Sequence, residues 1–277
     1  ISHAEVNFFP GSQAKKNYLT ALQANLFNKI FYLSKQNWPS IISAVGEGLE
    51  QKHIQVYLDD PKLFSYLTSA NWAGVVPRAA QTVEGENSDF LALVESNNGA
   101  NKANYYLNRD IKLESAIGKE GEISHILRIT YTNNSPSEVF PAGKYRNRFK
   151  IFVPLGTKIN KASFGESDIL TRLTTFSEYG RAGYSVLLEV LPKETKTLVL
   201  EYNLSKNLSY KDNKANYKLE VIKQAGTDKD PFEWSMSYPI NVKIKDLASE
   251  AWTDTQEVTF KTDLQKDKLF LLNFLKQ

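Results

Sequence analysis

Hydrophobic positions along the chain change their spacing once, near residue 89. Before that point apolar residues recur every three or four positions, which is typical of helices that bury one face. After it they alternate with polar residues, which is typical of strands. We therefore predict an α+β chain, with a helical region over residues 1–80 and an antiparallel β domain over residues 81–277.

Three helices and one short strand are expected in the helical region. The first helix covers residues 12–33, after the breaker Pro10-Gly11, and the second begins near Pro39. Asp60 followed by Pro61 is typical of a helix N-cap and first helical position, so a third helix begins there. A strand is expected over residues 54–58. The second and third helices are expected to bury these residues: Ile41, Ile42, Val45 and Leu49, and Leu63, Phe64 and Leu67.

Alternation in the β domain predicts many short strands separated by polar turns. A hairpin is expected around the turn at residues 118–121, with residues 123–131 as its second strand. The other expected strands cover residues 146–153, 184–191, 197–204, 216–224, 240–244, 257–261 and 269–275. Strands at this spacing predict a β-sandwich or a large curved antiparallel sheet, on which the helical region packs.

Residues 89–110 combine a buried strand with an amide-rich turn. The apolar run at 90–94 ends in a polar cluster that contains Asn98, Asn101 and Lys102. Amide side chains present paired donors and acceptors that suit sugar hydroxyls, and Tyr105 or Tyr106 would stack on a sugar. Alternatively, Asn and Gly simply form the turn, because both tolerate positive φ and Asn bonds its own backbone. Turn chemistry accounts for all of these residues, so we favour the second interpretation.

Four cations alternate along one predicted strand: Lys144, Arg146, Arg148 and Lys150. Alternate residues of a strand share a face, so the cations would line roughly 20 Å of it. Such a row suits an acidic glycan, a teichoic-type phosphate polymer or an anionic headgroup. The alternative is a solvated sheet face neutralised by neighbouring acids, or lysines that protect an edge strand. This row is the best candidate for a binding surface.

Of the four tryptophans, Trp234 is the one that stands out as a candidate sugar platform. It lies in the segment DKDPFEWSMSYP, which we interpret as a polar loop, whereas most Trp residues pack in a core. His125 lies on an apolar strand face and is interpreted as a histidine of the rim or the core. No metal-binding spacing is found, and no cofactor is expected.

Charge and composition limit the classes of function. The chain has 34 cations, 31 anions and a net charge of +3, which is too balanced to indicate nucleic-acid binding. It has no cysteine, which excludes disulfides, thiolate metal sites and a cysteine nucleophile. Ser12 and Lys15 match a Ser-x-x-Lys pattern, but its partner motifs are absent, so no catalytic residue is assigned.

The segment DFLALVESNNGANKANYYLNRD, at residues 89–110, resembles the bacterial domain-of-unknown-function family 4012. EQKHIQVYL at residues 50–58 and YRNRFKIFVPLG at residues 145–156 also resemble segments of that family. The resemblance covers roughly residues 7–239 and only the C-terminal portion of longer members. It implies a cell-surface, extracytoplasmic protein whose membrane contact is one N-terminal helix absent from this chain. No activity is established for the family.

These observations lead to three candidate functions. The first is a non-catalytic envelope module that binds an acidic surface polymer or another surface protein. The alternative is the accessory half of an envelope glycan- or phosphoglycan-transfer enzyme whose catalytic part lies upstream, or a purely structural spacer. Because the chain begins with Ile1 rather than Met, we expect it to be part of a longer protein.

Overall fold

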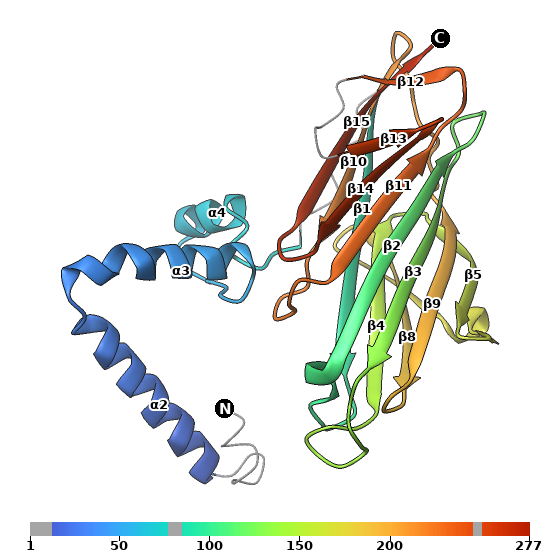
Figure 1. Ribbon diagram of the computed structural model, residues 1–277. Helices are drawn as coiled ribbons and strands as arrows, with labels where there is room; N and C mark the ends of the chain where they lie inside the picture. The colour runs from blue at the N-terminus through green and yellow to red at the C-terminus, as the bar shows by residue number, and fades with distance from the viewer. Residues whose placement is uncertain (1–12, 77–84, 246–250) are drawn as a thin grey trace. The chain divides into compact units, whose positions relative to one another are not determined.

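The computed structural model describes residues 13–76, 85–245 and 251–277 and divides into two compact units, Ile1–Leu49 and Glu50–Gln277 (Figure 1). The predicted boundary between residues 80 and 81 lies outside the described residues. The prediction of an α+β chain with a strand-rich C-terminal region is confirmed.

Three helices occur where the apolar spacing predicts them: α2 at Gln13–Phe31, α3 at Trp38–Glu50 and α4 at Pro61–Ser69. The Asp60 side chain accepts bonds from the backbone N–H groups of Lys62 and Leu63, which confirms the predicted cap. The strand expected over residues 54–58 is wrong, because the segment is not a strand; within the described part of the chain, Val56 N donates to Trp72 O at 3.0 Å.

The predicted burial of the helices is largely wrong. Leu49 is the buried residue of α3, whereas Ile42 is 66% exposed, and no residue of α4 is buried. Apolar spacing shows which side chains share a face of a helix, but not whether another element covers that face.

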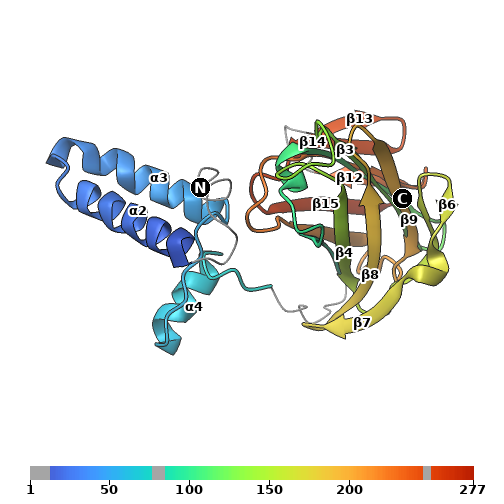
Figure 2. The ribbon, with the colours of Figure 1, turned by 90° about the horizontal axis from the view of Figure 1, so that it is seen from below.

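The second unit contains a β-sandwich of two sheets (Figures 1 and 2). Sheet A has seven strands in the order β12 (Val242–Lys245), β15 (Lys268–Lys276), β10 (Lys214–Ile222), β1 (Glu86–Asn97), β4 (Tyr145–Pro154), β8 (Arg181–Val190) and β7 (Thr174–Glu178). Sheet B has eight, in the order β13 (Ala251–Asp254), β14 (Glu257–Asp263), β11 (Pro231–Ser237), β2 (Leu107–Ile117), β3 (Ile123–Asn133), β9 (Thr195–Asn203), β5 (Lys158–Phe164) and β6 (Ser167–Asp168).

The core lies between the two sheets and follows from alternation along the strands. In β3, buried and half-buried residues alternate over the whole strand, and the buried set includes Leu127, Ile129 and Tyr131. These pack in one apolar cluster with Phe149 and Ile151 of β4, which come from the other sheet. The two inner faces therefore supply the core, as in other sandwiches.

The sheets are not purely antiparallel, which corrects the prediction. Each sheet contains one parallel pair, β1 with β10 in sheet A and β2 with β11 in sheet B. Two of the passages from sheet A to sheet B lie between β1 and β2 and between β10 and β11. We call these two connections the two corners of the sandwich. They run side by side in the same direction, so the strands that lead into them, β1 and β10, are parallel, and so are the strands that leave them, β2 and β11.

A second, smaller apolar cluster lies on the outer face of sheet A. Phe90, Ala92 and Phe152 are buried there, and Phe176 of β7 packs edge-on against Phe152 with ring centres 5.4 Å apart. Gly183 of β8 is required at this point, because a Cβ added to it would overlap the Phe176 ring. Part of the outer face is thus closed to water by an aromatic side chain from the edge strand.

Gly183→Ala should therefore lower the free energy of unfolding by about 1–3 kcal/mol, since overpacking displaces the Phe176 ring. Adding Phe176→Ala should remove the clash, so the two changes should be less than additive by about 1 kcal/mol. Urea unfolding of the two single variants and the double variant measures this coupling. Gly46→Ala is the matched control, because a Cβ there meets nothing within 4 Å. If Gly183→Ala lowered the free energy of unfolding equally in the unchanged chain and in the Phe176→Ala variant, the clash with the Phe176 ring would not be the cause.

Candidate functional site

The four predicted cations lie at the start of β4 and point outward as the alternation predicts. Tyr145, Asn147 and Phe149 are buried, whereas Arg146 and Arg148 are exposed between them. Lys150 is half-buried, with its Nζ 5.6 Å from the centre of the Phe176 ring. The row therefore forms part of the outer face of sheet A.

Two of the four cations pair with acids. Arg146 Nε lies 3.2 Å from Glu189 Oε2 on the neighbouring strand β8, and Lys144 Nζ lies 3.6 Å from Glu138 Oε1. Both pairs are solvent-exposed, and such pairs contribute only about 0–1 kcal/mol. The neutralisation considered in the alternative interpretation is thus present for half of the row.

Arg148 and Lys150 differ from their neighbours. Among the described residues, no carboxylate lies within 4.0 Å of either cationic group. Arg148 lies opposite Leu187 in the β4–β8 pairing, and Arg172 Nη2 donates to the Leu187 carbonyl at 3.0 Å. Arg172 is thus a third exposed cation, and it contacts the backbone of Leu187, the residue opposite Arg148. Sequence spacing gave no signal for it, because it comes from a separate turn.

The amide-rich turn has mainly a structural role, which supports the favoured interpretation. Asn97 Nδ2 donates to Asn101 Oδ1 at 2.9 Å, and Asn97 Oδ1 accepts from the N–H of Gly99 at 2.9 Å. Asn101 Nδ2 donates to the carbonyl of Lys144 at 2.9 Å, and its Oδ1 accepts from the N–H of Ala103 at 3.1 Å. Asn101 is thus occupied by internal bonds.

The turn nevertheless lies beside the basic row. The N–H of Asn98 donates to the carbonyl of Arg146 at 2.7 Å, and the side chains of Asn98 and Lys102 are exposed. Tyr105 is 83% exposed. The structure therefore brings two separately predicted features to one end of sheet A. We call Arg146, Arg148, Lys150, Arg172, Asn98 and Lys102 the basic surface.

Trp234 does not belong to this surface, and its assignment as a ligand platform is wrong. It lies in β11, is fully buried, and stacks on Phe260 with ring centres 5.3 Å apart. Its Nε1 donates to Ser115 Oγ at 2.9 Å. The acidic residues before it suggested a loop, but the alternation of Phe232, Trp234 and Met236 is the strand signal that was missed.

A buried chain of polar groups joins the two sheets around Trp234. Ser115 Oγ lies 2.7 Å from His125 Nδ1, and His125 Nε2 lies 3.1 Å from Asp89 Oδ2. The Tyr217 hydroxyl also donates to Asp89 Oδ2, and burial followed by the nearby Asp89 charge raises the Tyr217 pKa. Serine, histidine and aspartate here resemble a hydrolase triad in composition. They are 5%, 1% and 3% exposed, however, so substrate cannot reach them and their role is structural. His125 is thus in the core, as its apolar neighbours predict.

A second buried network holds the two corners together. Glu95 accepts bonds from Tyr131 at 2.6 Å, Tyr145 at 2.8 Å and Arg109 at 2.8 Å. Arg109 also contacts Asp230, which precedes β11, with Nη2 2.5 Å from Oδ2. Burial acts to lower the pKa of Arg109, but Glu95 and Asp230 outweigh it and raise that pKa overall. Burial raises the pKa of Asp230, against the effect of Arg109.

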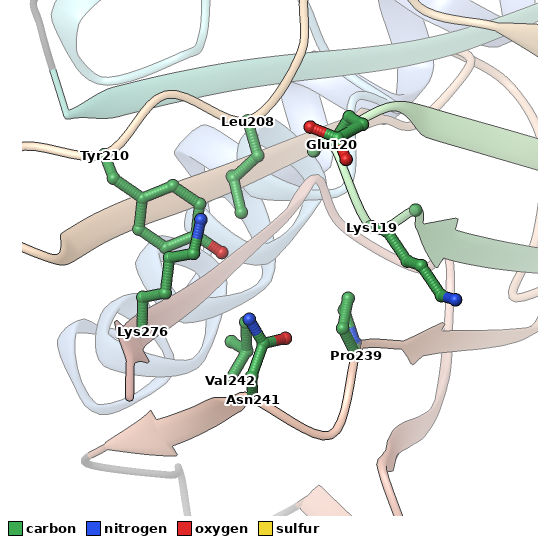
Figure 3. A pocket seen from close by; sticks show the side chains of 10 residues that line it. Lys119, Glu120, Leu208, Tyr210, Pro239, Asn241, Val242 and Lys276 are labelled. Carbon is green, nitrogen blue, oxygen red and sulfur yellow. The ribbon is translucent and has the colours of Figure 1, made fainter.

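Neither a metal site nor a membrane-spanning helix is found in the part of the chain that the structure describes. No group of three metal-ligating side chains occurs there, and no helix there is long and apolar enough to cross a bilayer. A pocket lined by Tyr210, Asn241 and Lys276 has a volume of about 80 Å³ (Figure 3). That volume is well below the roughly 300–1,000 Å³ of most ligand sites.

Comparisons with known proteins give only distant structural likenesses. No protein family model and no curated protein matches the chain. A putative nutrient binding protein from Legionella pneumophila is 8% identical with a TM-score of 0.40, over 68% of this chain and 71% of that one. An M1 zinc metallopeptidase from Deinococcus radiodurans is 13% identical with a TM-score of 0.31, over 61% of this chain and 42% of that one. Yeast LTA4 hydrolase is 7% identical with a TM-score of 0.36, over 64% of this chain and 30% of that one. These likenesses are too weak to carry an argument about function.

Proposed function

We propose that this chain is an extracytoplasmic cell-envelope module whose task is to bind an acidic surface polymer on the basic surface. The observation that carries the proposal is Arg148, which is exposed, has no carboxylate within 4.0 Å among the described residues, and shares the outer face of β4 with Arg146. The resemblance to a family of bacterial surface proteins supports the compartment, and membrane contact through a segment outside this chain belongs to the same proposal.

The spacing of the cations suits a polymer better than a small ion. Arg146 and Arg148 are alternate residues of one strand, so their side chains leave the sheet roughly 7 Å apart. A guanidinium makes bidentate hydrogen bonds with a carboxylate or a phosphate, so successive arginines can each bind one anionic group of a polymer. The exposed amide of Asn98, beside Arg146, is placed to bind sugar hydroxyls.

Replacing both Arg146 and Arg148 by Ala should weaken binding of polygalacturonate or of a poly(ribitol phosphate) about 30-fold. The estimate assumes that each arginine contributes about 1 kcal/mol to binding, as a partly exposed charged contact does. Losing both contacts costs about 2 kcal/mol, and about 1.4 kcal/mol corresponds to a tenfold change in affinity. Binding of the unchanged chain should also weaken as salt is added, because exposed charges are screened. Isothermal titration calorimetry at two salt concentrations measures both effects.

The matched control is Lys112→Ala with Arg128→Ala, which removes two cations from the face of sheet B. Its affinity should equal that of the unchanged chain. Equal weakening by both double variants would show that net charge, and not this surface, drives binding. No binding by any of the three proteins would reject the proposal in favour of a spacer or an accessory half of an enzyme.

A further inference from the structure

Tyr105 is an aromatic side chain that the amide-rich turn presents to solvent beside the basic surface. It is 83% exposed and lies in the 3-10 helix η2, Ala103–Tyr106, which directly follows Lys102. Single exposed aromatic residues are common on protein surfaces. Two further features therefore matter for this one, namely what holds its ring in place and which groups lie next to it.

The backbone around Tyr105 is held by hydrogen bonds on both sides. The N–H of Tyr105 donates to the Lys102 carbonyl at 2.9 Å, and the N–H of Lys102 donates to the Pro141 carbonyl at 2.7 Å. The Tyr106 carbonyl accepts from the N–H of Asn134 at 2.9 Å. The two tyrosine rings meet edge to face, with centres 5.1 Å apart and planes at 87°, which leaves at least one face of the Tyr105 ring open. A ring held in this way loses little conformational freedom when a ligand packs on it.

The geometry of the turn places the ring next to a member of the basic surface. In a 3-10 turn, side chains three residues apart are eclipsed, and the rise is about 2 Å per residue. Lys102 and Tyr105 are three residues apart, and the bond between their backbones is the one that defines such a turn. The two side chains therefore leave the turn on the same side, from positions about 6 Å apart.

An aromatic face next to a cation suits a sugar ring that carries a carboxylate. The C–H groups on one face of a pyranose ring form an apolar patch that packs on an aromatic ring, while the carboxylate at its rim binds a cation. An open-chain polyol phosphate carries similar negative charge but has no ring face. The arginines alone would bind both classes of polymer, whereas Tyr105 favours the one that is built from rings.

We propose, on the basis of the function proposed above, that the acidic polymer is a glycan of uronate rings and that one of its rings stacks on Tyr105. Arg146 and Arg148 bind carboxylates elsewhere along the same glycan chain. The exposed amide of Asn98 lies in the same turn as Tyr105, and its N–H bonds the carbonyl of Arg146. It can therefore bind hydroxyls of the rings between the two contacts.

Isothermal titration calorimetry of Tyr105→Ala with polygalacturonate and with poly(ribitol phosphate) tests the proposal. We expect about tenfold weaker binding of polygalacturonate, as for the loss of a stacked aromatic contact, and a change of less than about twofold for poly(ribitol phosphate). Tyr105→Phe keeps the ring and should bind polygalacturonate within about twofold of the unchanged chain. Salt screens charges but not stacking, so the effect of Tyr105→Ala should be the same at two salt concentrations, whereas that of replacing Arg146 and Arg148 should shrink at the higher one.

Tyr179→Ala is the matched control, because it removes the same side chain from the other end of sheet A. Tyr179 is 57% exposed in the turn before β8, whereas Arg146 lies opposite Glu189 near the end of β8. These two ends of the strand are roughly 30 Å apart. The affinity of Tyr179→Ala for polygalacturonate should equal that of the unchanged chain.

Three results would overturn the proposal. If Tyr105→Ala bound polygalacturonate as the unchanged chain does, while the Arg146 and Arg148 double variant lost affinity, stacking would be rejected and the binding function would stand. If Tyr105→Ala weakened binding of both polymers equally, the loss would not come from a sugar ring. If the unchanged chain bound poly(ribitol phosphate) but not polygalacturonate, the ligand class would be wrong and the function would stand, whereas binding of neither polymer would reject both.

Discussion

Arg109→Met should lower the free energy of unfolding by about 3–5 kcal/mol at neutral pH, because it leaves two buried carboxylates without their cation. Glu95 and Asp230 are 4% and 15% exposed, and Arg109 contacts both of them. Removing one partner of a buried charge network costs far more than the network itself contributes. Urea unfolding followed by circular dichroism measures the loss.

The stability lost in Arg109→Met should become smaller as the pH is lowered to about 5, because Asp230 then takes up a proton and no longer needs a cation beside it. Burial already raises the pKa of Asp230 above its ordinary 3.8, so the folded state holds this proton more tightly than the unfolded state. The contribution of Asp230 to stability therefore falls as the pH rises from its ordinary pKa through its folded pKa. Without Arg109, which acts to lower that pKa, the same effect should be larger and reach higher pH.

Arg128→Met is the matched control, since it breaks an exposed pair with Glu114 at 3.3 Å. It should cost less than about 1 kcal/mol at either pH. If Arg109→Met cost no more than Arg128→Met, the buried network would not hold the two corners of the sandwich together.

Trp234→Ala should also lower the free energy of unfolding by about 3–5 kcal/mol, because the site is fully buried and would be left as a cavity. Trp234→Phe keeps most of the ring but loses the bond to Ser115 Oγ, so it should cost about 1–3 kcal/mol. Unfolding by urea, followed by far-ultraviolet circular dichroism, compares the two without relying on tryptophan fluorescence.

Trp252→Ala provides the control for Trp234. Trp252 is 76% exposed on β13, so its removal should change the stability by less than about 0.5 kcal/mol. A large loss for Trp252→Ala with a small loss for Trp234→Ala would reverse the assignment of core and surface given by the structure.

Local patterns in the sequence predicted the elements well. Alternation located β3 and β4 and assigned Arg146 and Arg148 to the outer face, and Asp60-Pro61 gave the start of α4. The same patterns gave the wrong element for Trp234, because its charged neighbours suggested a loop although the apolar residues around it alternate as in a strand. They also failed for the burial of α3, since burial depends on what covers a helix and not on its own spacing.

The candidate sites depended on contacts that no local pattern encodes. Arg172 reaches the basic surface only because β7 and its preceding turn pair with β8. His125 was predicted at the rim or in the core and lies in the core, but its neighbours Asp89 and Ser115 follow from strand register across two sheets. Such long-range register is not visible in one sequence.

The side-by-side corners have a consequence for the order in which the chain folds. β1 is a buried strand made early, yet its partner β10 is made only after every strand from β2 to β9. During synthesis, one edge of this apolar strand therefore remains open until eight further strands have been made. Pairings so distant in sequence are slow to form, and unpaired edges invite aggregation. The chain should thus fold late and as a whole, and a truncation before β10 should leave an aggregation-prone fragment instead of a smaller folded domain.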